Sequence, residues 1–306
     1  KLISEIERRA AERAEISRER LQTVLSEQVQ AVKAIAADGA ANLRADSERL
    51  VSERLAELPQ ANTSRFLNFN RRLTDESVAL LQHWATTLGV QRDSGALAYM
   101  AHRIEGMEAI ARGRLAASAE TQILRNLVAL SARTEKFEAL EIGTLYGLGA
   151  AALIETAATR FASARLTVID PFEGYYGETH DPLLGLPITR AGFEANMRRL
   201  DIPPDAYRVI AGFSEKEDTI AAARGPGYHF LLIDGDHSYE GVRRDFENYA
   251  PMVKRYGYVL IDDYGVPEYD GIQRYVDETL KHHDRLQFVG AAFSTAVFRI
   301  WRKLEA

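Results

Sequence analysis

The stretch "FLLIDGDHSYEGVRRDF", residues 230–246, carries the pattern that decides the fold. Its apolar first residues lead directly into a charged cluster that begins at Asp234 and ends at His237. A second stretch, "GYVLIDDYG", ends in the same way at Asp262 and Asp263. Short apolar runs of this kind are typical of strands that are buried on both faces of a sheet. Two buried strands are therefore predicted to present carboxylates at their carboxyl ends.

The same alternation of apolar strand and helix extends over residues 137–302. Five strands are predicted at 137–143, 165–170, 207–212, 229–234 and 257–262, each followed by a helix, at 148–160, 190–200, 215–224, 239–255 and 271–283. Such an alternation indicates a parallel sheet covered by helices on both faces. Two more strands, at 286–292 and 294–302, are joined by a short link and are expected to form an antiparallel pair at one edge. The fold class is therefore α/β.

Residues 1–58 contain neither proline nor aromatic residues and are rich in Glu, Arg and Ala. Apolar residues recur at steps of three and four, at Ile3, Ile6, Ala10, Leu21, Val24, Val32, Ile35, Leu43 and Leu50. This spacing predicts a coiled coil that joins copies of the chain into a homo-oligomer, either a dimer or a trimer. The alternative is a single solvated helix packed loosely on the next domain.

Residues 61–135 are predicted to be a helical neck or cap, with a turn at 88–95 and a break near Gly113. The predicted domains are therefore a coiled coil over 1–58, this neck over 61–135, and an α/β domain over 136–306.

The composition excludes several classes of protein and site. A net charge of −6 argues against a nucleic-acid partner. The absence of cysteine excludes disulfides and thiolate metal sites. No apolar run is long enough for a transmembrane segment. Because the chain begins at Lys1 rather than Met, we interpret it as a fragment. The expected location is cytoplasmic, with membrane association through a partner or a missing upstream segment as the alternative.

The residues at the strand ends are candidates for a ligand site, because ligands of open α/β sheets bind beyond the carboxyl ends of the strands. The first such loop, "EIGTLYGLGA" over residues 141–150, is rich in glycine but lacks the G-x-G-x-x-G spacing of dinucleotide sites. Asp170 ends the second strand, where an acidic residue usually accepts hydrogen bonds from ribose hydroxyls. An adenosine without phosphates fits both features.

With these motifs, residues 137–302 resemble class I S-adenosylmethionine (SAM)-dependent methyltransferases. The resemblance implies a Rossmann-like seven-stranded sheet whose last two strands form an antiparallel edge hairpin. It also implies that Gly143 and its neighbours hold the methionine part of SAM, that Asp170 holds the ribose, and that Phe213 and Ser214 border the adenine. The full set of implied cofactor-binding residues is Glu141, Gly143, Tyr146, Gly147, Asp170, Phe172, Phe213, Ser214 and Asp234.

The motifs "IDGDHSYEGV" and "IDDY" resemble the metal-dependent O-methyltransferases, especially the branch that acts on sugars and natural products. The resemblance implies one divalent cation held by Asp234, Asp262 and Asp263. Oxygen ligands favour Mg²⁺, with Mn²⁺ or Ca²⁺ as alternatives. Catechol-type relatives have a lysine three residues after the first metal acid, where this chain has His237. Asp234 and His237 are therefore the catalytic candidates, with His237 as general base or as a residue that orients a metal ligand.

Less specific interpretations remain open for two of the aspartates. Asp236 is expected to cap the helix that starts near Ser238. Asp263 is either a metal ligand or a solvent-facing residue beside Asp262.

The long loop after the second strand, "PFEGYYGETHDPLLGLPITR", is expected to bind the acceptor or to form a mobile lid without specific contacts. The candidate substrate residues are Tyr175, Tyr176, His180 and Asp181. The predicted function is SAM-dependent, divalent-metal-dependent O-methylation of a sugar or glycan hydroxyl. The alternatives are a natural-product O-methyltransferase and a catalytically silent coiled-coil assembly protein.

Overall fold

The computed structural model describes residues 73–174, 180–225 and 227–304, together with Gln30 and Lys33. Apart from those two residues, the predicted coiled coil lies outside the described part of the chain and stays a prediction. From residue 73 onward, the described residues other than 183–185 belong to one compact unit.

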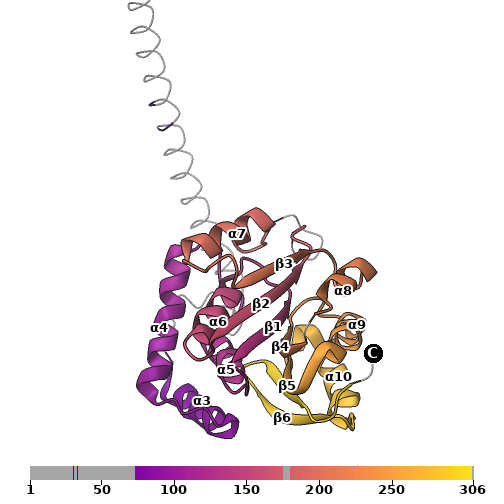
Figure 1. Ribbon diagram of the computed structural model, residues 1–306. Coiled ribbons are helices and arrows are strands. Elements are labelled where there is room, and N and C mark those ends of the chain that lie inside the picture. Colours follow the sequence, from indigo (N-terminus) through magenta and orange to yellow (C-terminus); the bar gives the residue numbers. More distant parts are fainter. Residues whose placement is uncertain (1–29, 31–32, 34–72, 175–179, 226, 305–306) are drawn as a thin grey trace, which may run out of the picture. The chain divides into compact units, whose positions relative to one another are not determined.

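A seven-stranded sheet forms the centre of this unit (Figure 1). Its strands are β1 (Lys136–Ile142), β2 (Ser163–Asp170), β3 (Tyr207–Ala211), β4 (Tyr228–Ile233), β5 (Val253–Ile261), β6 (Leu286–Ala292) and β7 (Thr295–Ile300). The strand order is β3-β2-β1-β4-β5-β7-β6, with β1 to β5 parallel and β7 antiparallel to both of its neighbours. The predicted α/β sheet of Rossmann-like methyltransferase type, with its antiparallel edge hairpin, is confirmed.

The three central strands end in register, because Ile142 pairs with Ile233 and Ile233 pairs with Ile261. The next residue of each strand therefore emerges at the same edge of the sheet. These residues are Gly143, Asp234 and Asp262. The register thus brings the charged strand ends together.

The helices are α3 (Asp75–Leu88), α4 (Ser94–Ile110), α5 (Ala119–Leu130), α6 (Leu148–Ala158), α7 (Arg190–Arg199), α8 (Glu217–Ala223), α9 (Tyr239–Tyr249) and α10 (Asp270–Glu278). Several begin at a residue whose side chain accepts a backbone N–H of the first turn, which is the usual stabilising cap. These caps are Thr74, Asp93, Ser118, Thr189 and Ser238. No helix in the described part of the chain combines the length and the apolar composition that crossing a membrane requires.

The helices α9 and α10 pack on one face of the sheet through a core that includes Phe246, Tyr275 and Val259. The sequence predicted that the first of these helices would run from 239 to 255, but α9 ends at Tyr249. Pro251 has no backbone N–H to continue the helix, so a single 3₁₀ turn follows and β5 starts directly after it.

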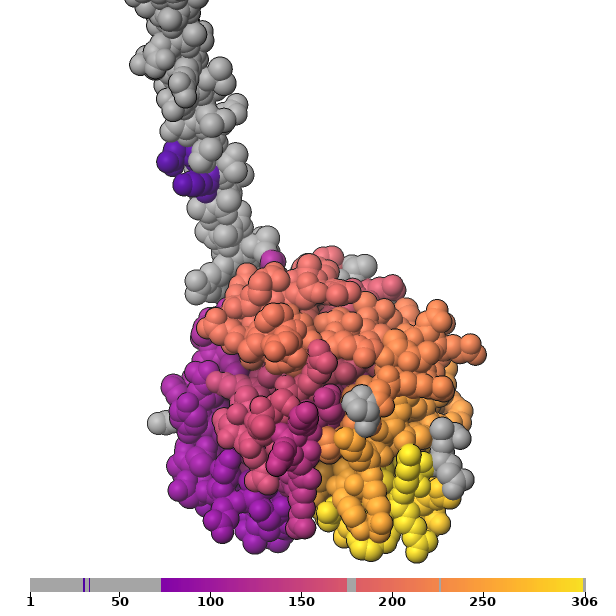
Figure 2. Space-filling model, in the orientation of Figure 1, coloured from indigo at the N-terminus to yellow at the C-terminus, as the bar shows by residue number. Residues whose placement is uncertain are grey.

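The helix α5 packs against α6, and nearly every residue of α5 is buried. Polar side chains join the two helices. The Gln122 amide donates to the Asn126 side chain at 2.9 Å and to the carbonyl of Gly149 at 3.3 Å, and the Asn126 amide donates to the Thr156 hydroxyl at 3.0 Å. Figure 2 shows the purple surface of the N-terminal helices lying directly against the pink and orange surface of the segment that follows. The predicted breaks at 88–95 and near Gly113 are confirmed, since they separate α3, α4 and α5.

Candidate active site at the strand ends

A cavity of about 760 Å³ lies at the carboxyl ends of the parallel strands. It is lined by six of the nine predicted cofactor residues, Glu141, Gly143, Asp170, Phe213, Ser214 and Asp234. It is also lined by His237, Asp262 and Asp263, which complete the predicted metal and catalytic residues. Nine of the predicted site residues therefore meet at one cavity, although they come from five different strand ends.

Three other predicted cofactor residues do not line this cavity. The hydroxyl of Tyr146 donates to the carbonyl of Leu186 at 3.2 Å, and its ring is buried. The ring of Phe172 packs against Phe193, with ring centroids 5.7 Å apart. Gly147 starts α6 where an added Cβ would overlap the Phe193 ring. These residues shape the loops around the cavity through packing.

The predicted substrate residues are also away from the cavity lining or cannot be placed. Tyr175 and Tyr176 lie outside the described residues. His180 is exposed and pairs with Pro187 in an isolated antiparallel bridge. Asp181 is fully buried behind the cavity wall, where its carboxylate accepts from Arg114 at 2.8 Å. Arg114 itself lines the cavity.

The glycine loop and Asp170 form a rigid corner of the cavity. Gly143 has φ +82°, and an added Cβ would overlap the carbonyl of Asp234, so only glycine fits there. The Asp170 carboxylate accepts from the N–H of Thr144 at 2.9 Å and from the N–H of Phe172 at 2.7 Å. Each carboxylate oxygen has a second lone pair. Asp170 can therefore accept further hydrogen bonds from ligand hydroxyls in the cavity.

The loop after β3 lines the cavity next to Asp170, whose backbone carbonyl accepts from the N–H of Gly212 at 3.1 Å. Phe213 is 45% exposed, so its ring offers an apolar surface to a ligand. The Ser214 carbonyl accepts from the Tyr249 hydroxyl at 2.7 Å, and the Ser214 side chain hydrogen-bonds to the buried carboxyl group of Asp245. Burial raises the pKa of Asp245 to about 7, although the Ser214 hydrogen bond opposes the change. Both anchors come from α9 and fix the position of this loop.

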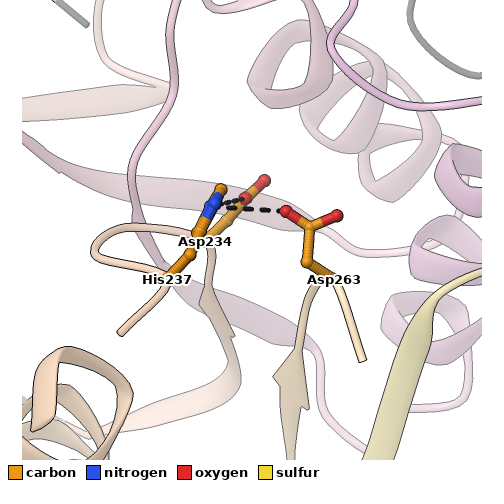
Figure 3. Close-up of side chains that lie close together, drawn as sticks. All are labelled: Asp234, His237 and Asp263. Atoms are coloured by element: carbon orange, nitrogen blue, oxygen red, sulfur yellow. Dashed lines mark ion pairs between the residues drawn. The ribbon is translucent and has the colours of Figure 1, made fainter. Parts of the chain in front are cut away.

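Asp234, His237 and Asp263 converge from two strand ends, as Figure 3 shows. The Nε2 atom of His237 lies 3.7 Å from Oδ1 of Asp234 and 3.4 Å from Oδ2 of Asp263. Burial alone would lower the pKa of His237, but the two carboxylates outweigh burial and raise it above its ordinary value. Burial and the nearby Asp262 raise the pKa of Asp234.

Asp262 lines the cavity beside the cluster of Asp234, His237 and Asp263, but its contacts are different. Its Oδ2 lies 2.5 Å from Nη2 of Arg125, and its Oδ1 accepts from the Thr295 hydroxyl at 2.9 Å. The same Arg125 nitrogen lies 3.3 Å from Oδ2 of Asp234. Burial would raise the pKa of Asp262, but Arg125 outweighs it and the pKa is lowered.

Arg125 was missed in the sequence interpretation, which treated its helix as part of a neck or cap. A recognisable pattern was present, because Gln122, Arg125 and Asn126 lie at spacings of three and four on a helix that is mostly apolar after its first turn. Polar residues on one face of a buried helix require partners, because burying them without hydrogen bonds is costly. The spacing was therefore a usable indication that this helix has buried polar partners.

The cluster fits a divalent cation. Each of Asp234, His237 and Asp263 offers one ligand atom, and these atoms all lie within 4.8 Å of one another. That spacing suits a shared ion with metal–ligand bonds of about 2.0–2.6 Å. A set of two carboxylates and one imidazole is better suited to Mn²⁺ than a set of oxygen atoms alone would be.

The helix α9 is capped by Ser238, and not by Asp236 as the sequence suggested. The Ser238 hydroxyl accepts from the N–H of Gly241 at 3.0 Å. Asp236 instead accepts from the N–H of Ser238 at 2.9 Å and so stabilises the turn before the helix.

Comparison with known proteins agrees with this geometry. Residues 140–264 match the model of the family Methyltransf_24, described as a methyltransferase domain. This match supports a class I SAM-dependent methyltransferase domain in that part of the chain. It runs from within β1 to just beyond the end of β5 and includes the five strand ends described above.

One relative and two solved structures that are similar to this chain share between 15% and 30% sequence identity with it. The uncharacterized protein R132 of Acanthamoeba polyphaga mimivirus is 30% identical over 127 residues, which are 37% of this chain and 58% of that protein. Solved structures to which the chain is similar include the following two. The O-methyltransferase NovP is 17% identical with a TM-score of 0.47, and the alignment covers 74% of this chain and 100% of NovP. Cofactor-bound Rv0187 from MTB is 15% identical with a TM-score of 0.46, covering 78% of this chain and 94% of that one.

Proposed function

We propose that this protein is a SAM-dependent O-methyltransferase that uses a divalent cation and acts on a hydroxyl of a sugar or glycan. One observation carries the proposal. A single cavity is lined both by the glycine loop with Asp170 and by the cluster of Asp234, His237 and Asp263. A methyl donor and a cation-held acceptor could therefore be bound side by side, as direct methyl transfer requires.

On the donor side, the corner made by Gly143 and Asp170 supports binding of an adenosine-containing cofactor without a pyrophosphate. Asp170 would accept from the ribose hydroxyls through its remaining lone pairs. The exposed ring of Phe213 would pack against the adenine. In the reaction the methyl group leaves the sulfonium of SAM for the acceptor oxygen, and S-adenosylhomocysteine remains.

On the acceptor side, Asp234 and Asp263 would hold the cation, with either His237 or Asp262 as a further ligand. A cation there would bind the acceptor hydroxyl and lower its pKa. The hydroxyl proton must also be taken up. The imidazole of His237 faces the two aspartates, so His237 would take this proton if it is not itself a cation ligand.

The preference for a polyhydroxylated acceptor rests on the charged and hydroxyl-bearing side chains that stand among the apolar residues lining the cavity. Beyond the aspartates, the lining includes Arg114, Thr144, Glu173 and Arg244. Charged and hydroxyl-bearing side chains of this kind suit an acceptor with many hydroxyl groups better than an apolar one. A smaller natural product with a free hydroxyl is the alternative acceptor.

Calorimetry with SAM, S-adenosylhomocysteine and NAD tests the donor assignment. We expect micromolar binding of the first two ligands. Asp170→Ala should weaken SAM binding by roughly tenfold or more, since it removes hydrogen bonds made by a charged group. Asp205→Ala, which changes an exposed aspartate, is the matched control and should bind SAM like the native chain. Tight binding of NAD without binding of SAM would exclude the methyltransferase assignment.

Transfer of labelled methyl groups to a panel of sugars, glycans and small phenols tests the acceptor and the cation. We expect activity on sugars that is lost in EDTA and restored by Mg²⁺ or Mn²⁺. His237→Gln separates the two roles of this residue. A base would lose about 10² to 10⁴-fold in rate with unchanged cation affinity. A ligand would lose cation affinity as well. Full activity in EDTA would contradict the metal requirement.

A further inference from the structure

Arg125 brings a buried positive charge from α5 into the acid cluster. Its side chain is only 4% exposed, and its Nε–H has no hydrogen-bond partner among the described residues. Its Nη2 contacts the carboxylates of both Asp262 and Asp234. One guanidinium group therefore bridges two strand ends from a helix more than a hundred residues earlier in the chain.

This positive charge offsets a concentration of carboxylates that would otherwise repel one another. Glu141, Asp234 and Asp262 are each close enough to Arg125 for its charge to affect their ionisation. Buried carboxylates of this kind need a cation nearby, because transfer from water costs several kcal/mol per charge. Among the other arginines that line the cavity, Arg114 is paired with Asp181 and Arg244 lies 3.8 Å from Asp236.

A guanidinium group and a divalent cation would compete for these acids. Both oxygens of Asp262 are already occupied, one by Arg125 and the other by Thr295. Asp234 is shared, because its Oδ2 faces Arg125 and its Oδ1 faces His237. The proposed divalent cation would therefore enter a site in which one of the three aspartates, Asp262, is already neutralised by Arg125.

We propose that Arg125 is a resident cation of this site, which competes with the metal for Asp262 and Asp234 and so limits how tightly a divalent cation binds beside Asp234 and Asp263. This inference rests on the metal site of the proposed function, but it assigns a role to a residue outside that set. Arg125 acts here as a positioning residue, since it works through Asp262 and Asp234.

The test is the affinity for Mn²⁺ alone, measured by calorimetry without SAM or acceptor. Arg125→Gln should bind Mn²⁺ roughly tenfold or more tightly than the native chain, because a positive charge a few ångströms from the ion is removed and Asp262 becomes available. The double variant Arg125→Gln with Asp262→Asn should lose most of that gain. Arg103→Gln removes an arginine from an exposed ion pair with Glu155 and should leave the affinity unchanged.

An Arg125→Gln variant whose Mn²⁺ affinity is unchanged or weaker would overturn the inference. If this variant unfolds without metal, Mn²⁺ should restore its folding, because the ion replaces the missing positive charge. A variant that stays unfolded in saturating Mn²⁺ would also overturn it. If the native chain binds no Mn²⁺ and Arg125→Gln does, the inference is supported while the metal requirement of the proposed function fails. If the native chain does not bind SAM, the proposed methyltransferase function is contradicted, but the role of Arg125 in Mn²⁺ affinity is not.

Discussion

Single residues in this fold show how burial sets the ionisation of a carboxyl group. Asp245 lies on α9 and is 1% exposed. Ser214 hydrogen-bonds to it, but its Oδ2 atom has no hydrogen-bond partner within the described residues. A charged carboxylate in that position is unfavourable, which is why the pKa rises to about 7.

This raised pKa makes the stability of the protein depend on pH. The unfolded chain releases the Asp245 proton near pH 4, whereas the folded chain keeps it until about pH 7. Between these values the folded state binds more protons, so stability falls as the pH rises from about 4 to about 7. Asp245→Asn removes the ionisable group. It should be more stable than the native chain at pH 8, by at most about 4 kcal/mol, with little difference at pH 4.

Urea unfolding of both proteins at pH 4.5, 6 and 8 checks this prediction. Asp205→Asn, at an exposed position, is the control and should show no such trend. A variant that is equally destabilised at all three pH values would mean that Asp245 matters for packing and not for charge.

At the scale of the elements, the linker between α4 and α5 is fixed by hydrogen bonds to a buried side chain of α7. The fully buried side chain of Asn196 on α7 accepts from the N–H of Arg112 at 2.9 Å and donates to the carbonyls of Arg112 and Tyr146 at 2.8 and 2.9 Å. Gly113 follows with φ +104° and lies directly on the ring of Tyr146. The linker therefore fixes the start of α5 and, with it, the position of Arg125.

Two glycine substitutions distinguish the contact between Gly113 and the Tyr146 ring from the general effect of replacing a glycine with alanine. Gly113→Ala should cost several kcal/mol, because the new Cβ would overlap the buried Tyr146 ring and because alanine is strained at this φ. Gly106→Ala lies within α4 and meets nothing within 4 Å. It should stabilise the protein by about 0.5–1 kcal/mol through higher helix propensity. The denaturant midpoints of the two variants measure both changes in stability. Equal midpoints would contradict the packing of Gly113 against Tyr146.

The elements differ in how well the sequence predicts them. The strands from β1 to β5 and the edge hairpin were predicted to within a few residues, because continuous apolar runs and helical periodicity are strong patterns. The predicted end of α9 at residue 255 is wrong, because Pro251 stops the helix after Tyr249. Asp234, Asp262 and Asp263 were recognisable because carboxylates directly after buried strands are uncommon.

The contribution of α5 to the site could not be obtained from local patterns. Periodicity shows that α5 has apolar faces, but it does not show which part of the sheet those faces cover. The ion pairs of Arg125 depend on the packing of α5 against α6, which brings together residues far apart in the sequence. The positions of Tyr146 and Asp181 behind the cavity depend in the same way on how the loops fold.

At the scale of the whole molecule, the coiled coil predicted over residues 1–58 would set the oligomeric state. We expect it to join two or three copies of the chain, because its apolar residues at Ile3, Val24 and Leu50 belong to a repeat of threes and fours. Sedimentation of the full chain beside a shorter chain that starts at Gln60 tests this. The full chain should be a dimer or trimer and the shorter chain a monomer. Two monomers at micromolar concentration would exclude the coiled coil.

The position of Arg125 also limits how this protein can be recombined with its relatives. The family match begins at residue 140, after α5 has ended at Leu130. A chimera joined at the first strand would thus receive the aspartates from one parent and the balancing arginine from another. A junction before Asp93, ahead of α4, would transfer α4, the linker and α5 together with the sheet. With that junction, Arg125 and the aspartates that it contacts come from the same parent protein.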